Sequence, residues 1–159
     1  MARVSPLEEV LPLLYAFLNR HEGRRLTAYH DHKGFLTIGV GHNIDADTNW
    51  PKGKTTISED ECDAILAKDA ETAIQDCFQL FSNYRVLPVG VKAALADMAF
   101  NLGRTKLAQF KRLRAAIEAR DFEGAALEVE DSNYFRDPQL FKQGRPQFIR
   151  DIIRFHEKP

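Results

Sequence analysis

The chain has 159 residues, of which 44% are hydrophobic and 28% are charged, and its formal net charge is −1. This length predicts one domain, and the balanced charge with ample hydrophobic content excludes an intrinsically disordered chain. No apolar run is long enough to span a membrane, and the short run 13–18 lacks the basic flank of a signal peptide, so we expect no membrane insertion.

The first predicted element is a helix over residues 6–22. A Ser-x-x-Glu capping box beginning at Ser5, with proline at the first helical position, is typical of a helix start. Pro12 lies inside the apolar pattern, so it either kinks this helix or marks the start of a second one. We expect the helix to end at Glu22, because Gly23 adopts the backbone angles that follow a helix C-terminus.

Residues 23–57 are expected to form a small antiparallel hairpin lobe. Two short β-prone runs, 26–29 and 35–38, flank a turn that contains Asp31. The polar loop after them carries Trp50, the only tryptophan. We expect this side chain to cover the small sheet, and contact with a ligand is the alternative.

A long helix is predicted over residues 58–81, followed by a helical lobe over residues 82–159. The very apolar segment 88–102 is expected to form the centre of that lobe, because only a thin polar stripe would remain on a helix there. Further helices are predicted at 107–120, 122–131 and 146–155, with an irregular aromatic stretch at 133–143.

These elements predict an α+β fold within one domain, residues 1–159. The hairpin lobe and the helical lobe are joined by the long helix, and the cleft between them is the expected ligand site. The two cysteines, Cys62 and Cys77, would lie about 22 Å apart on the long helix. We therefore expect buried free thiols and no disulfide.

The stretch from Glu22 to His42 carries the strongest chemical signal. Asp31 follows Glu22, then Thr37, and a Gly-x-Gly-His sequence closes the run. Two carboxylates at turns on either side of a strand suit glycoside hydrolysis, in which one donates a proton and the other serves water. The negative end of a helix dipole disfavours a second negative charge, which suits Glu22 to the acid role. Taken singly, each of these residues is more often structural.

The spacing of these residues resembles the catalytic segment of the phage-type lysozymes, the lysozyme family of the T-even bacteriophages. Weaker similarity continues through the run from Asp97 to Gly103 and through Gly144-Arg145. The resemblance implies a lysozyme-like fold and an inverting muramidase without a cofactor. Its substrate would be the β-1,4 bond between N-acetylmuramic acid and N-acetylglucosamine in bacterial peptidoglycan.

The same resemblance implies the roles of individual residues. Glu22 would be the acid, and Asp31 and Thr37 would hold the attacking water. Substrate contacts would come from Gly41, Phe100, Asn101, Asn133 and Arg145. Core packing explains Phe100 equally well, and a solvated helix start is the alternative for Arg145.

The resemblance further implies that His42 pairs with Asp69 on the long helix as a structural contact. The sequence has no HExxH or Cys/His spacing, so we expect no metal site. Residues 104–120 carry six basic residues and one acid, which would suit a nucleic-acid patch. Five acids follow within residues 121–131. We therefore interpret the basic residues of 104–120 as a solvent-exposed helix face and expect no nucleic-acid partner.

The family resemblance also suggests a biological setting. We expect a monomeric phage endolysin, held in the host cytoplasm until a holin opens the membrane and releases it to the periplasm. A module of a tail-spike or toxin protein is an alternative. So are transglycosylase or chitinase activity at the same site, and a catalytically silent wall-binding domain. The silent domain is disfavoured because Glu22, Asp31 and Thr37 are all present.

Overall fold

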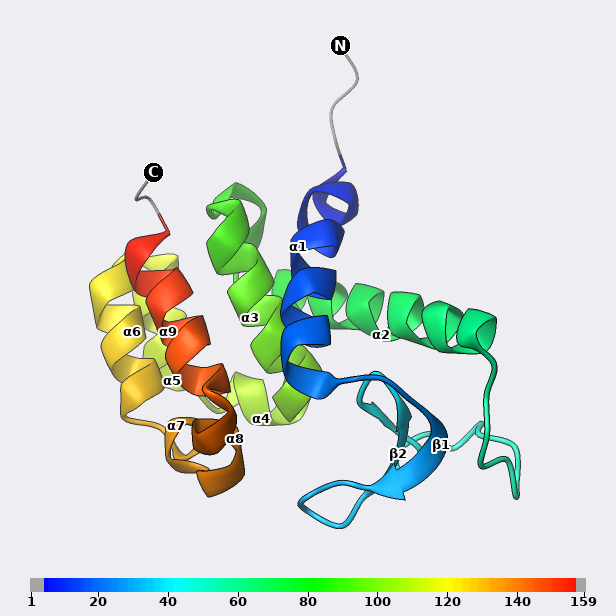
Figure 1. The fold of residues 1–159 in the computed structure, drawn as a ribbon. Coiled ribbons are helices and arrows are strands. Elements are labelled where there is room, and N and C mark those ends of the chain that lie inside the picture. The colour runs from blue at the N-terminus through cyan, green and yellow to red at the C-terminus, as the bar shows by residue number, and fades with distance from the viewer. Residues whose placement is uncertain (1–4, 157–159) are drawn as a thin grey trace.

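A computed structural model describes residues 5–156 and shows a small sheet and a group of helices linked by one long helix (Figure 1). The α+β class predicted from the sequence is confirmed. The elements in chain order are α1 Pro6–Glu22, β1 Arg25–His30, β2 Leu36–Gly39, β3 His42–Asn43, α2 Glu59–Leu80, the 3-10 turn η1 Tyr84–Val86, α3 Val89–Leu102, α4 Arg104–Ala108, α5 Lys111–Glu118, α6 Phe122–Glu130, α7 Asn133–Arg136, α8 Pro138–Gln143 and α9 Arg145–Phe155.

The sheet is antiparallel with the strand order β1-β2-β3. Tyr29 pairs with Thr37 across β1 and β2, and Thr37 pairs with Asn43 across β2 and β3. The two predicted strands are present. The third strand is only two residues long, too short to leave a period-two pattern in the sequence.

Helix α2 runs from the sheet into the helical lobe, and its length is about 33 Å. Ser58 and Glu61 form the capping box at its start, as the sequence predicts. The helix packs against both α1 and α3. Cys62 and Cys77 are buried free thiols, which agrees with the prediction.

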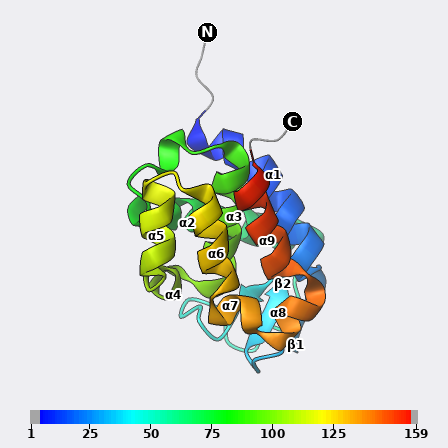
Figure 2. The same cartoon turned by 90° about the vertical axis from the view of Figure 1, so that its left-hand side faces the viewer.

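Helix α3 is the buried centre of the helical lobe. Every residue from Val91 to Ala99 is buried, and α1, α2 and α9 pack around the helix. On one face of the lobe, α6 lies between α5 and α9 (Figure 2). None of the helices between residues 5 and 156 combines the length and the apolar character of a membrane span.

Three local expectations need correction. Helix α1 continues through Pro12, so a second helix start in this region is wrong. The predicted helix 107–120 is two helices, α4 and α5, because the backbone at Phe110 leaves the helical conformation, with ψ at 63°. The stretch 133–143 is not irregular. It forms α7 and α8, whose first turns are capped by the side chains of Ser132 and Asp137.

Candidate active site

Glu22 is the last residue of α1, and Gly23 follows with a φ of 72°, a conformation that favours glycine. The Glu22 side chain is 18% exposed. Its Oε2 atom accepts a hydrogen bond from Nη1 of Arg145 at 2.6 Å. The helix end therefore delivers a carboxyl group that is anchored on one side and partly open on the other.

Gly41 brings the backbone of the hairpin lobe against this carboxyl group. A Cβ atom at this position would lie 2.8 Å from Cδ and Oε1 of Glu22, and the φ of Gly41 is 69°. Both observations require glycine here. Gly41 also lines the main groove of the molecule, so the Glu22 carboxyl group adjoins a residue that borders that groove.

Asp31 lies in the turn between β1 and β2, where the backbone holds its side chain in place. Its Oδ1 atom accepts hydrogen bonds from the N–H groups of Lys33 at 2.9 Å and Phe35 at 2.8 Å. Such bonds are typical of aspartate in turns. The turn is thus built around the Asp31 carboxylate, which remains half-buried.

Thr37 is on β2 and only 4% exposed. Its hydroxyl donates a hydrogen bond to the carbonyl of Phe35 at 2.8 Å. Because a hydroxyl has one proton and two lone pairs, Thr37 retains only the capacity to accept. It can therefore bind a water molecule that donates a hydrogen bond to it.

Tyr29 lies near enough to both carboxyl groups for their charges to affect its pKa, and no role was predicted for it from the sequence. The side chain lies on β1 opposite Thr37. Burial raises the pKa of Tyr29, and the negative charges of Glu22 and Asp31 raise it further against the opposing charge of Arg25. The charges of both Glu22 and Asp31 therefore act on the pKa of the Tyr29 hydroxyl. An aromatic residue in a strand carries no local signal of this position.

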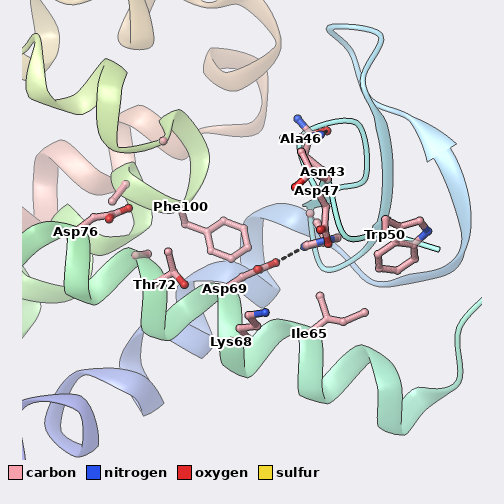
Figure 3. Close-up of a pocket in the computed structure, with 16 residues that line it drawn as sticks. Asn43, Ala46, Asp47, Trp50, Ile65, Lys68, Asp69, Thr72, Asp76 and Phe100 are labelled. Atoms are coloured by element: carbon pink, nitrogen blue, oxygen red, sulfur yellow. Dashed lines mark hydrogen bonds and ion pairs between the residues drawn. The ribbon is translucent and has the colours of Figure 1, made fainter. Parts of the chain in front are cut away.

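The main groove has a volume of about 490 Å³ and lies between the 43–50 loop, α2 and the end of α3. Figure 3 shows the Phe100 ring pointing into the space between α2 and the loop that carries Asn43 and Asp47. Trp50 also lines this groove, while its Nε1 donates to the carbonyl of Lys54 at 2.9 Å. Gly41 and Phe100 are thus the predicted substrate contacts that border the groove.

His42 occupies one wall of the groove between two aspartates. Its Nδ1 is 2.6 Å from Oδ2 of Asp69, and its Nε2 is 2.9 Å from Oδ2 of Asp47. The hydrogen bond to Asp69 is the main reason that the pKa of His42 is raised, although burial opposes it. The contact between His42 and Asp69 is the pairing expected from the sequence. Asp47 was missed because acidic loop residues are common.

Arg145 is not a solvated helix start. It is 1% exposed, and besides Glu22 it contacts Asp97 on α3, with 2.9 Å between Nε and Oδ1. Burial works against the charge of Arg145, but Asp97 and Glu22 outweigh this effect and raise its pKa. Burial likewise raises the pKa of Asp97, yet the adjacent guanidinium brings it below its ordinary value.

Asp97 was quoted in the sequence analysis but given no role. The sequence does contain a sign of this role. Asp97 is the only acidic residue in the mostly apolar run from Val91 to Ala99, where Lys92 is the only other charged residue. His21 is a further polar neighbour, with 3.7 Å between its Nδ1 and Oδ2 of Asp97. This distance is too long for a hydrogen bond.

The two predicted asparagine contacts do not line the main groove. Asn133 borders a separate cavity of about 440 Å³ formed by the start of α5 and the end of α6. Asn101 is half-buried, and its Oδ1 has no hydrogen-bond partner within residues 5–156. Across that same range, no group of three or more His, Cys, Asp or Glu side chains is arranged to hold a metal ion.

Comparison with known proteins gives a consistent result. The phage lysozyme family profile matches residues 19–142. A probable T4-type lysozyme of Dictyostelium discoideum is 30% identical over 138 residues, which cover 74% of this chain and 81% of that protein. The endolysin of Salmonella phage P22 is 32% identical over 112 residues, covering 69% of this chain and 73% of the endolysin.

A third relative is much longer than this chain. The pre-baseplate central spike protein of Enterobacteria phage T4 is 28% identical over 159 residues. The match covers 86% of this chain but only 26% of the spike protein. The same kind of domain is therefore found both as most of a protein and as one part of a larger one.

Proposed function

Because this chain belongs to the phage lysozyme family and is a peptidoglycan-hydrolysing muramidase, we propose that Glu22 is its general acid and that Asp31 and Thr37 hold the attacking water. The observation that carries this assignment is the position of the Glu22 carboxyl group. It is anchored by Arg145 on one side and lies close to Gly41, a residue that borders the groove, on the other.

The proposed reaction proceeds in one displacement with inversion. Glu22 donates its proton to the glycosidic oxygen as the bond to the anomeric carbon breaks. Water attacks that carbon from the opposite face, and Asp31 accepts a proton from it. Thr37 orients the water by accepting a hydrogen bond, since its own proton is engaged by Phe35.

Inversion requires room for water between the acid and the base. Inverting glycosidases separate their carboxyl groups by about 6.5–9.5 Å, whereas retaining enzymes hold them about 5–5.5 Å apart. Glu22 ends α1 and Asp31 lies in the turn between β1 and β2, and this placement on separate elements supports the wider arrangement. NMR of the first product from β-linked glycan should show the α-anomer. A β-anomer formed first would overturn the assignment to Asp31 and Thr37 but leave the glycosidase activity intact.

We further propose that the protein acts as a monomeric phage endolysin, kept in the host cytoplasm until a holin opens the membrane. The similarity to the P22 endolysin over most of its length supports this role. Expression in a Gram-negative host should cause lysis only when a holin is co-expressed. Lysis without membrane opening would contradict the proposal, and light scattering in solution would test the monomer.

The similarity to part of the T4 spike protein supports a second candidate, a wall-cutting module of a larger phage particle protein. Such a module would act from outside the cell during entry. Immunodetection in purified virions distinguishes the two roles, because an endolysin is absent from the particle and a spike module is bound to it.

A further inference from the structure

Two carboxyl groups share one guanidinium where α1, α3 and α9 meet. Arg145 donates from Nη1 to Oε2 of Glu22 at 2.6 Å and from Nε to Oδ1 of Asp97 at 2.9 Å. We propose that Asp97 is a positioning residue for the acid. By holding Nε of Arg145 and opposing its charge, Asp97 weakens the hold of the guanidinium on the Glu22 carboxyl group. This inference rests on the acid role proposed for Glu22.

The geometry of the guanidinium decides how strongly it holds Glu22. Arginine binds a carboxylate most strongly through two parallel N–H bonds. Here Nε donates to Asp97, Nη1 donates a single hydrogen bond to Glu22, and Nη2 has no hydrogen-bond partner within residues 5–156. Asp97 therefore fixes the guanidinium from its Nε edge and leaves Glu22 with a one-point contact.

Burial makes this arrangement effective. The side chains of Asp97 and Arg145 are 0% and 1% exposed, so water screens their charges only weakly. The negative charge of Asp97 offsets the positive charge of Arg145 as seen by Glu22. A general acid must be protonated before it reacts, so an unopposed arginine beside it would reduce the active fraction.

The other groups around Glu22 do not provide this balance. Tyr29 on β1 and Tyr134 on α7 both feel its charge, and burial raises the pKa of both, so they stay neutral in the working range. His21, on α1 itself, lies near Asp97 at 3.7 Å. Asp97 is consequently the carboxylate that competes directly with Glu22 for Arg145.

The test is the pH dependence of kcat/KM on purified peptidoglycan for wild type, Asp97→Asn and Asp97→Glu. Asparagine keeps the shape and removes the charge, so the alkaline limb of the profile should move down by about one pH unit. On that limb the variant would be about ten-fold less active than wild type, with a smaller loss at acidic pH. Asp97→Glu keeps the charge and should return the limb toward the wild-type position.

Asp151→Asn is the matched control. Asp151 also accepts a hydrogen bond from an arginine, Arg150, at 2.9 Å on α9, but it is 49% exposed and has no contact with Glu22. Its profile should superimpose on that of wild type. If Asp97→Asn lowers activity by one factor at every pH, Asp97 is merely structural and the proposal is overturned.

Two further variants cover the remaining outcomes. If Asp97→Asn does not fold, Asp97→Asn/Arg145→Met removes the buried pair as a unit, and the alkaline limb should then lie above the wild-type position. An unmoved limb in this double variant would overturn the proposal. Glu22→Gln, assayed alongside, separates the two assignments. If it is active, the acid role itself fails, whereas an inactive Glu22→Gln with unmoved limbs rejects only the role of Asp97.

Discussion

Two clusters in this molecule have the same plan, a cation held between two carboxylates. The acid cluster is Glu22–Arg145–Asp97 inside the helical lobe, and the groove cluster is Asp69–His42–Asp47 between α2 and the loop after β3. Arginine stays charged at every working pH, whereas histidine titrates near neutrality. The cation of the acid cluster is therefore always charged. The cation of the groove cluster is charged only when His42 is protonated, so its contacts with Asp69 and Asp47 depend on pH.

The largest effect is expected within the acid cluster. Glu22→Gln keeps the size of the side chain but cannot donate a proton, so lytic activity should fall by roughly 10²–10⁴-fold. Turbidity loss of permeabilised Gram-negative cells measures it, with circular dichroism to check the fold. Activity within threefold of wild type would remove Glu22 from the acid role.

The second effect concerns stability. Arg145→Met leaves Asp97 buried without its cation, which should lower the free energy of unfolding by about 3–5 kcal/mol. The double variant with Asp97→Asn should lose less, because no buried charge remains. Urea unfolding provides both values. Arg150→Met, at a partly exposed ion pair on the same helix, is the control and should cost less than about 1 kcal/mol.

The groove cluster should respond to pH in a range where the buried Asp97–Arg145 pair of the acid cluster does not. The folded pKa of His42 is raised above 6.5, so its stabilisation is fully present below that value and is lost as pH rises through the folded pKa. His42→Asn should therefore cost about 1–2 kcal/mol at pH 5.5 and less at pH 8.5. Urea unfolding of both proteins at the two pH values measures this change.

The acid cluster supplies the contrast for that measurement. Asp97 has a lowered pKa, so its contribution is present above its unfolded value of about 3.9 and is lost only as pH falls through the folded pKa. In a Glu22→Gln background, where Glu22 cannot titrate, the cost of Arg145→Met should thus be the same at pH 5.5 and pH 8.5. An equal pH dependence at the two clusters would refute the distinction between them.

The smallest effect is expected at Asp47. The hydrogen bond with His42 lowers the pKa of Asp47, so its contribution is lost only as pH falls through that value. Asp47→Asn should cost less than about 1 kcal/mol at pH 7, because Asp69 still holds His42 and the Asp47 side chain is 28% exposed. A loss as large as that of His42→Asn would show that Asp47, rather than Asp69, carries the link.

Much of the local structure was predictable from the sequence. The capping boxes at Ser5 and Ser58 locate the starts of α1 and α2, and Gly23 locates the end of α1. These signals act within a few residues, so they do not depend on the rest of the fold. Short elements escaped prediction for the opposite reason, because β3 has only two residues and α7 only four.

The sequence by itself determined the family and the elements that carry the site, since Glu22, Asp31, Thr37 and Gly41 all lie within residues 22–41 of the chain. Only the tertiary structure decided which charges share a partner. Arg145 meets residues 123 and 48 positions away in the chain, and His42 meets one 27 positions away. Such contacts depend on how whole helices pack, and no local preference for turn, strand or helix records that packing.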